Sequence, residues 1–251
     1  MVNRDELASY MDMQLDSQRF QDYGPNGLQV EGKANIGKIV SGVTASLALI
    51  QKAVALKADA IIVHHGLFWR GQDGRIVGWM KERLKHLLVH EINLYAYHLP
   101  LDASPTMGNN AMLGKLLGLE VQTYTAEQGL LAIGQPVGGK AISLEQLTQK
   151  IQTQLGRAPT VIPGNDRVLN KIAWCSGGGQ GFFEAAIAAG ADAYITGEIS
   201  EPQVHYARET GVAYLACGHH ATERFGVQAL AEHIAAHFGL KHQYIEVDNP
   251  A

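Results

Sequence analysis

Short apolar runs alternate with helical patterns along the whole chain. Runs such as Ile61-Ile62-Val63 and Ala213-Tyr214-Leu215-Ala216 have the length and composition of buried strands. The segments between such runs place apolar residues three or four positions apart, as residues 47–57 do. Consecutive parallel strands need a crossover, which is usually a helix. The pattern therefore predicts an α/β protein with largely parallel strands flanked by helices.

The same periodicities give the expected elements in order. Helices are expected at residues 3–15, 47–57, 79–90 and 109–117, in a segment opened by Ser143, and in a long segment that starts near Thr222. Strands are expected at residues 38–43, 59–63, 93–97, 119–124, 130–134, 171–175, 191–195 and 212–217. Ser143 and Gln146 fit a capping box at the start of their helix.

Part of the sequence repeats. The segment 171–175 resembles 38–42 at an offset of 133 residues (171 − 38), and 191–195 resembles 58–62 at the same offset (191 − 58). The segment 212–217 resembles 92–97 at an offset of 120 (212 − 92), with the deletion in a loop and helix, where deletions are tolerated. We therefore predict two related, interlocked α/β lobes from an internal duplication, at residues 1–125 and 126–251.

Acids and histidines follow the predicted strands in both lobes. His64 and His65 end one strand, Asp102 follows another, and His219 and Glu223 follow a third in the second lobe. His219 and Glu223 are four residues apart, so they should share one face of the first turn of the long helix. Ligands of open α/β sheets bind beyond the carboxyl ends of the strands. We therefore predict that these side chains meet in one site between the lobes.

The chemistry of this set favours two metal ions. A catalytic zinc needs only three protein ligands. Three imidazoles and two carboxylates suit two cations about 3.5–4 Å apart, for which Glu223 is the candidate bridge. Nitrogen and oxygen donors without thiolate fit Zn, Fe, Mn, Co or Ni rather than Mg. A simpler alternative stays open, in which one histidine of the pair is packed and Asp102 is a turn residue.

The other histidines give weaker evidence of metal binding. His86 and His90, and also His233 and His237, are four residues apart on predicted helices, but neither pair has a converging acid. We expect both pairs on exposed polar faces. His98, at the end of the strand 93–97, is a candidate proton shuttle or a hydrogen-bonding neighbour of the ligands.

Two further features lie near the predicted strand ends. The run Ser176-Gly177-Gly178-Gly179-Gln180 between a strand and a helix could hold a phosphate, or could simply allow a close turn. It lacks the lysine of a P-loop and the dinucleotide fingerprint. Cys175 and Cys217 lie inside apolar strands, where they are expected to be inert core residues.

Composition narrows the classes of protein. The chain has 251 residues, 46% of them hydrophobic, and a net charge of −4. No segment is rich in Lys or Arg, which argues against a nucleic-acid partner. No apolar run has the length of a membrane span, and the acidic, amphipathic start does not resemble a signal peptide. Two cysteines without metal-type spacing suit a reducing compartment, so a cytoplasmic location is expected.

Several motifs together resemble one family along the whole chain. These motifs are Asp22-Tyr23-Gly24-Pro25-Asn26-Gly27-Leu28-Gln29-Val30, His64-His65-Gly66, His98-Leu99-Pro100-Leu101-Asp102 and Gly218-His219-His220-Ala221-Thr222-Glu223. They resemble the GTP cyclohydrolase I type 2 homologues, also called NGG-interacting-factor-like proteins, and within them the short bacterial YbgI-type members.

The resemblance implies a metal site, an oligomeric assembly and an enzymatic activity. It implies a dinuclear divalent-metal site formed by the five residues named above, in a toroidal homohexamer with an internal cavity. The family label implies metal-activated water attacking the imidazole-ring carbon of GTP. Our first hypothesis is therefore a metal-dependent hydrolase of a nucleotide-like small substrate, with His98 as the proton shuttle. The alternative is a non-enzymatic metal-binding scaffold or regulatory oligomer. A DNA-handling ring is disfavoured by the net charge of −4.

Overall fold

The computed structural model describes residues 1–165 and 168–251 and divides into two compact units. The first unit comprises Met1–Leu101 and Gly226–Asp248, and the second comprises Asp102–Phe225 and Asn249–Ala251. Each unit contains a mixed β-sheet flanked by helices. The α/β class expected from the alternation of apolar runs and helical patterns is confirmed.

The division of the chain differs from the predicted boundary at residues 125/126. The chain enters the second unit at Asp102 and returns to the first at Gly226. The physical reason is strand pairing: β13 (Lys241–Tyr244) pairs with β4 (Lys38–Thr44), so the C-terminal segment completes the first sheet. Asp102 therefore belongs to the second unit, and not to the first as predicted.

The first unit is built on a five-stranded sheet with the order β13-β4-β5-β6-β2. Its remaining strands are β5 (Ala60–His65), β6 (Asn93–Ala96) and β2 (Gly27–Val30). Strands β13, β4, β5 and β6 are parallel, and β2 is antiparallel to β6. A separate two-stranded sheet pairs β1 (Val2–Asn3) with β3 (Asn35–Ile36). The helices are α1 (Arg4–Leu15), α2 (Leu47–Ala55), α3 (Gly78–Val89), α10 (Arg224–Phe238) and the short η1 (Ser17–Arg19).

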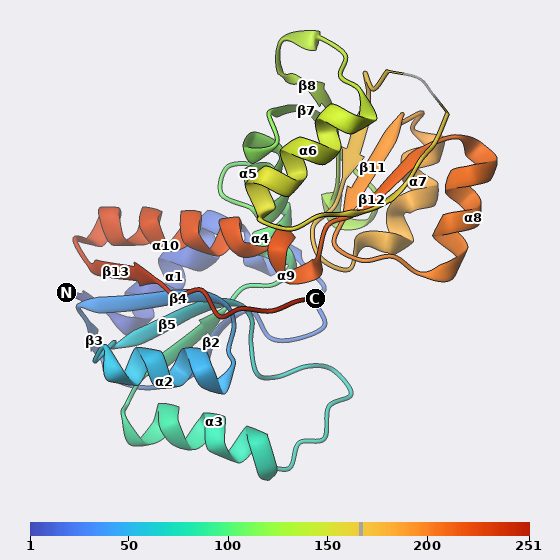
Figure 1. Ribbon diagram of the computed structural model, residues 1–251. Coiled ribbons are helices and arrows are strands. Elements are labelled where there is room, and N and C mark those ends of the chain that lie inside the picture. The colour runs from blue at the N-terminus through green and yellow to red at the C-terminus, as the bar shows by residue number, and fades with distance from the viewer. Residues whose placement is uncertain (166–167) are drawn as a thin grey trace. The chain divides into compact units, whose positions relative to one another are not determined.

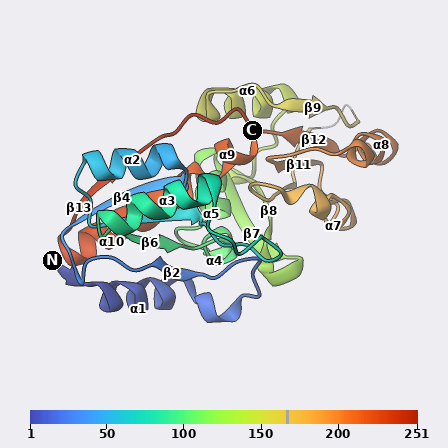
Figure 2. The same ribbon diagram turned by 90° about the horizontal axis from the view of Figure 1, so that it is seen from below.

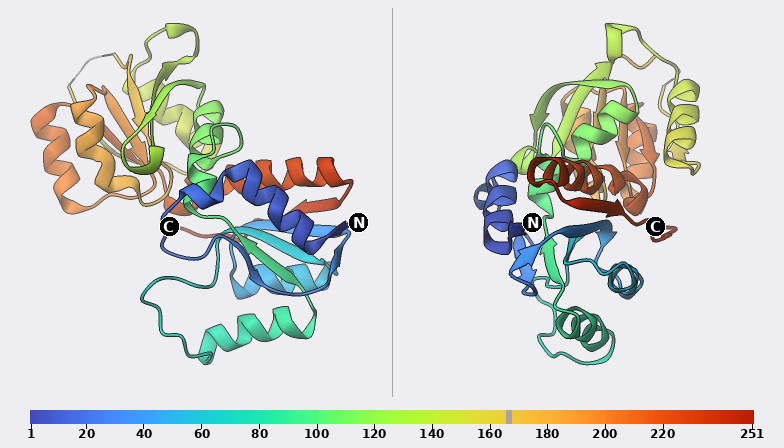
Figure 3. Two further views of the ribbon diagram at one scale, coloured as in Figure 1. Left: turned by 180° about the vertical axis from the view of Figure 1, so that it is seen from behind. Right: turned by 90° about the vertical axis from the view of Figure 1, so that its left-hand side faces the viewer.

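Helices cover both faces of this sheet. Helices α2 and α3 lie on one face, and α1 and α10 lie on the other (Figures 1 and 3). Leu49 and Leu84 from α2 and α3 pack with Ile61 and Leu94 of the strands in one buried cluster. Burial on both faces explains why the parallel strands read as continuous apolar runs.

The second unit is built on a six-stranded sheet with the order β7-β8-β10-β11-β12-β9. Its strands are β7 (Leu119–Thr125), β8 (Leu131–Pro136), β9 (Thr160–Ile162), β10 (Ile172–Trp174), β11 (Ala193–Thr196) and β12 (Ala213–Ala216). Strands β10, β11 and β12 are parallel, while β8 and β9 flank them in antiparallel pairing. The helices are α5 (Asn109–Leu116), α6 (Leu144–Leu155), α7 (Phe183–Ala188), α8 (Glu201–Thr210) and α9 (His219–Thr222), with short turns η2 (Glu127–Gly129), η3 (Val137–Gly139) and η4 (Gly179–Phe182).

The second sheet is also covered on both faces. Helices α5 and α6 lie on one face and α7 and α8 on the other (Figures 1 and 2). On the α7 side, Phe183 contacts Tyr194 and Tyr214 with ring centroids 5.6 and 4.8 Å apart. The predicted capping box of Ser143 and Gln146 is present at the start of α6, where it satisfies backbone N–H groups that lack a partner in the helix.

One expected helix is divided. The long helix predicted from Thr222 is instead the short α9, which ends at Thr222, followed by α10 from Arg224. Glu223 lies between them as the C-terminal cap of α9. The ligand pair His219 and Glu223 therefore belongs to a separate turn and not to the first turn of the long helix.

Equivalent hydrogen bonds recur in the two units. Each unit has three consecutive parallel strands, which are β4, β5 and β6 in the first unit and β10, β11 and β12 in the second. An aspartate directly before the middle strand accepts two backbone N–H bonds from residues close to the start of the first strand. Asp59 accepts from Gly37 and Lys38 at 3.0 and 3.1 Å, and Asp192 accepts from Asn170 and Lys171 at 2.9 and 3.0 Å. The repeated sequence thus makes the same local structure twice.

Candidate metal centre

The first unit gathers three histidines at the ends of its parallel strands. His64 and His65 are the last residues of β5, and His98 follows β6. The His64 ring centroid lies 4.5 Å from that of His65 and 5.0 Å from that of His98. Potential ligand atoms of all three lie within 4.8 Å of one another. His98 therefore belongs to the imidazole cluster itself.

Hydrogen bonds set the orientation of the first two rings. His64 is buried, and its Nδ1 lies 3.0 Å from the carbonyl oxygen of Tyr97. Because a carbonyl only accepts, Nδ1 carries the proton, and in the neutral ring the lone pair is on Nε2. Nδ1 of His65 lies 3.2 Å from Oγ1 of Thr44, at the end of the neighbouring strand β4. Such bonds hold an imidazole ready for a cation.

Asp22 holds His98. Its Oδ1 lies 2.7 Å from Nδ1 of His98. Burial works against ionisation of Asp22, but bonds from His98, the Asn26 side chain and the Leu99 backbone N–H outweigh it and lower its pKa to about 2. The carboxylate is then an acceptor for the His98 Nδ1–H. Our sequence reasoning missed Asp22, because it lies in the turn segment 22–30 and no spacing links it to a ligand.

The second unit gathers the carboxylates. Asp102, on the short helix α4 (Leu99–Ala103), is 7% exposed. Its Oδ1 accepts bonds from Asn109 Nδ2 at 2.8 Å and Ser176 Oγ at 3.2 Å. A potential ligand oxygen of Asp102 lies within 4.8 Å of one from Glu223, which is also buried. Asp102 is thus a buried, oriented acid and not an exposed turn residue.

His219 lies between two carboxylates. Its Nε2 is 3.3 Å from Oε2 of Glu223, and its Nδ1 is 2.6 Å from Oε1 of Glu198. Hydrogen bonding to Glu223, helped by Glu198 and opposed by burial, raises the pKa of His219 to about 9. A cation that binds at Nε2 must therefore displace a proton. Glu198 was not predicted to have a role.

The glycine run allows a close approach to these ligands. Gly177 has a φ of +61°, and a Cβ there would collide with Oε1 of Glu223 and lie 3.1 Å from Nε2 of His219. The Gly177 N–H donates to Thr222 Oγ1 at 2.9 Å, and the Gly179 N–H donates to Thr196 Oγ1 at 3.1 Å. Because these amides already have partners inside the protein, the close-turn interpretation fits the structure better than phosphate binding.

Four other histidines and the two cysteines make contacts that suit a structural role. His86 and His90 stack on α3 with ring centroids 6.1 Å apart, and His233 Nε2 lies 3.0 Å from the hydroxyl oxygen of Tyr10. His205 pairs with Glu201 on α8. Cys175 and Cys217 are buried free thiols, and burial raises the pKa of both, so neither is placed as a nucleophile.

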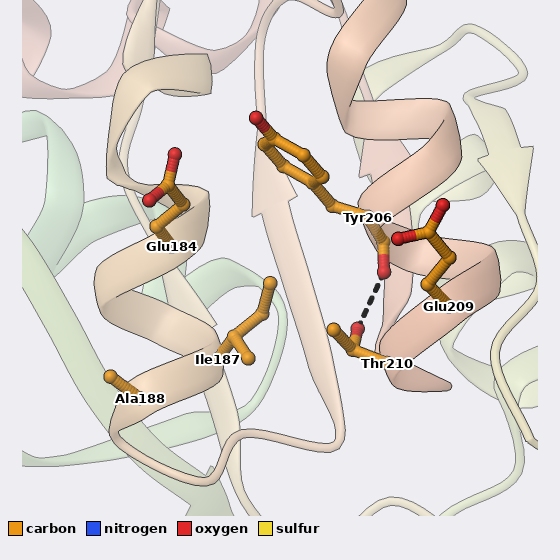
Figure 4. A pocket seen from close by; sticks show the side chains of 6 residues that line it. All are labelled: Glu184, Ile187, Ala188, Tyr206, Glu209 and Thr210. Carbon is orange, nitrogen blue, oxygen red and sulfur yellow. Dashed lines mark hydrogen bonds between the residues drawn. The ribbon is translucent and has the colours of Figure 1, made fainter.

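A shallow groove of about 370 Å³ lies elsewhere in the second unit, between α7 and α8 (Figure 4). Glu184 and Ile187 come from α7, and Tyr206 and Glu209 come from α8. Among the described residues that line it, none is a histidine or a cysteine. The mixed donors that suit a transition metal are at the strand ends instead.

Within residues 1–165 and 168–251, none of the helices combines the length and apolar character needed to cross a bilayer. The fold and the donor clusters together define the class: an α/β protein with two mixed sheets and clusters of His, Asp and Glu that could hold metal ions.

The chain belongs to the Duf34/NIF3 (NGG1p interacting factor 3) family, whose model matches residues 2–250. It is 51% identical, over the full length of both chains, to a protein of Neisseria meningitidis serogroup A named GTP cyclohydrolase 1 type 2 homolog. Among solved structures, protein ybgI, described as of unknown function, matches with a TM-score of 0.95 at 46% identity and full coverage of both chains. TTHA1606 from Thermus thermophilus matches with a TM-score of 0.89 at 38% identity, again over both full chains. The predicted family and its YbgI-type resemblance are confirmed.

Proposed function

We propose that this protein is a metal-dependent hydrolase of a nucleotide-like small substrate. In this proposal His64, His65, Asp102, His219 and Glu223 together bind two divalent cations. The observation that carries the proposal is the gathering of oriented histidines at the strand ends of one unit and of buried carboxylates beside an imidazole in the other. The name of the relatives, GTP cyclohydrolase 1 type 2 homolog, supports a nucleotide as the substrate class.

The donor chemistry fits such a pair of cations. The histidines of the first unit are neutral donors when they bind metal, while Asp102 and Glu223 add two negative charges. Five residues would be available to hold these cations, whereas a single structural zinc is held by four. The set is thus larger than one structural ion needs, which favours a catalytic role.

The protein's own groups have distinct tasks in this scheme. Divalent cations would supply Lewis acidity and lower the pKa of the water molecule that attacks the substrate. Glu198 fixes the orientation of His219, and Asp22 fixes that of His98. His98 can pass a proton between the reacting atoms and solvent, because the Asp22 carboxylate holds its ring at Nδ1. Zn, Fe, Mn, Co and Ni all remain compatible with these donors.

Elemental analysis tests the metal site directly. Protein purified without chelators should carry transition metal, whereas the His65→Ala and Glu223→Gln variants should carry much less. His205→Ala, which removes an exposed histidine on α8, should keep the wild-type content. Absence of transition metal from the wild-type protein would refute the proposal.

A substrate screen tests the reaction class. The metal-loaded protein should hydrolyse GTP, another nucleotide or a related small phosphoester, and the His65→Ala variant should not. If the loaded protein turns over none of these compounds, the non-enzymatic alternative of a metal-binding scaffold or regulatory protein is favoured.

We also propose that the two units arose by duplication and that the chain assembles as a ring-shaped homohexamer in the cytoplasm. Supporting the duplication are the sequence offsets of 133 residues (171 − 38 and 191 − 58) and the equivalent bonds of Asp59 and Asp192. Supporting an assembly are exposed apolar side chains at the start of α3, with Val77 60% and Trp79 58% exposed. Free thiols at Cys175 and Cys217 suit a reducing compartment.

A further inference from the structure

The last three residues lie against the turn that carries two of the proposed ligands. The chain leaves the first unit after Asp248, and residues 249–251 belong to the second. A main-chain oxygen of Ala251 accepts a bond of 3.2 Å from the backbone N–H of His220, in α9. The marked C-terminal end lies beside α9 in two views (Figures 1 and 2).

Arg157 joins this segment to the start of the turn. It lies between α6 and β9, and its Nη1 donates a bond of 2.7 Å to the carbonyl oxygen of Pro250. The guanidinium also packs on Gly218, since a Cβ on that residue would lie 2.7 Å from Cζ of Arg157. Gly218 has a φ of +97° and immediately precedes α9. One side chain therefore contacts both residues 249–251 and the entry to the turn.

The position of α9 depends on such external bonds. Four residues form too short a helix to be stable alone, because nucleation is costly and the end groups need partners. Thr222, at the end of α9, accepts from the Gly177 N–H at 2.9 Å. At the other end, the His220 N–H donates to Ala251. The proposed ligand His219 is the first residue of α9, and Glu223 follows its last residue.

We propose that Arg157 and residues 249–251 form a strap that positions α9 for cation binding. This inference rests on the proposed metal site, and it adds residues that do not touch the cation. Because coupling free energies are reciprocal, a strap that favours cation binding is itself stabilised when the cation binds. Docking of residues 249–251 then strengthens cation binding at His219 and Glu223, and cation binding strengthens the docking to the same extent.

Cation titrations test the coupling. The probe is Co²⁺, followed by its visible absorption, with Zn²⁺ as a competitor. Removal of residues 249–251, and separately Arg157→Ala, should weaken Co²⁺ binding by about threefold to tenfold, the effect of losing one or two hydrogen bonds, and should alter the Co²⁺ spectrum. Arg157→Lys, which keeps a donor, should recover part of the affinity. Arg208→Ala, which removes an arginine from α8, is the matched control and should bind as the wild type does.

Amide hydrogen exchange gives the reciprocal measurement. Zn²⁺ should slow exchange at His220 in the wild-type protein, and should slow it less in the shortened chain. Should the shortened chain fail to fold, Arg157→Ala decides the question. Wild-type Co²⁺ affinity and spectrum in Arg157→Ala would overturn the strap while leaving the metal site intact. A wild-type protein that binds neither cation would overturn both proposals.

Discussion

At the scale of single residues, the proposed ligand His219 and the proposed proton shuttle His98 are each held by an acid outside the ligand set. Asp22 orients His98 at 2.7 Å, and Glu198 orients His219 at 2.6 Å. Each carboxylate accepts from Nδ1, which leaves Nε2 as the nitrogen that can bind a cation in His219 and transfer a proton in His98. The orientation of both rings therefore depends on acids outside the ligand set.

Glu198 provides a direct test of this dependence. Glu198→Ala should weaken cation affinity about 10- to 100-fold, because His219 loses the partner that fixes its ring. Glu198→Gln retains an acceptor oxygen and should lose less. The affinity is measured by Zn²⁺ competition against a chromophoric chelator. Glu201→Ala, which removes the exposed partner of His205, is the control. Equal affinity in wild type and Glu198→Ala would contradict the assignment.

Gly177 offers a second test, with a matched glycine elsewhere. Gly177 and Gly190 both have positive φ, +61° and +73°, but only Gly177 has neighbours where a Cβ would be placed. Both Gly→Ala variants should lose about 1–2 kcal/mol of unfolding free energy from backbone strain. Gly177→Ala should in addition lose cation affinity, because the new methyl group displaces Glu223. Chemical denaturation and cation titration separate the two effects, and equal cation affinity in both variants would contradict the steric argument.

At the scale of elements, the two units repeat their strands and differ in the residues at the strand ends. The offsets of 133 and 120 residues identify the residues at corresponding strand ends. These are Thr44, His64 and His98 in the first unit and Gly177, Gly197 and Gly218 in the second. Those three glycines are linked by backbone bonds of 2.9 Å, from Gly197 to Gly177 and from Gly218 to Gly197. The same scaffold thus presents side chains in one unit and bare backbone in the other.

The aspartate that joins two strands in the first unit should make stability depend on pH. Although burial opposes ionisation of Asp59, bonds from Lys33 and from the Gly37 and Lys38 backbone N–H groups lower its pKa below 3.8. Because its folded pKa is depressed, its contribution is complete above the unfolded pKa and is lost as pH falls through the folded value.

We therefore expect Asp59→Ala to lower the free energy of unfolding by about 1–3 kcal/mol at pH 7, since two backbone donors lose their acceptor. The difference from wild type should shrink as the pH falls below the unfolded pKa of 3.8. Urea denaturation at several pH values measures it. Asp73→Ala, which breaks an exposed pair with Arg75, should change stability little at any pH. A difference for Asp59→Ala that does not shrink on acidification would contradict this account.

At the scale of the whole molecule, the proposed homo-oligomer predicts a sensitive surface on α3. Trp79 is 58% exposed, with the Arg83 guanidinium 4.7 Å from its ring centroid. Trp79→Glu should lower the mass in light scattering, because a carboxylate would replace the apolar side chain in the proposed contact. Met13→Glu, at a 66% exposed position on α1, should leave the mass unchanged. An unchanged mass for Trp79→Glu would place the contact elsewhere.

The sequence by itself determined the central strands and several of the helices, because apolar periodicity and caps act locally. The parallel strands β4, β5 and β6 and their counterparts β10, β11 and β12 were predicted within a few residues. The strands β2, β9 and β13 were not predicted: they are short edge strands, and pairing with a distant partner defines them more than their own sequence does.

The ligands were predicted from one rule, that side chains at the carboxyl ends of parallel strands converge. Within each unit, the predicted ligands do lie close to one another. Only the tertiary structure decided that His98 joins His64 and His65, that Asp22 and Glu198 hold two of the rings, and that the C-terminal strand returns to the first unit. Each of these depends on contacts between residues far apart in the chain. Such contacts leave no periodic signal in the sequence, because they are selected by packing and hydrogen bonding in the folded protein.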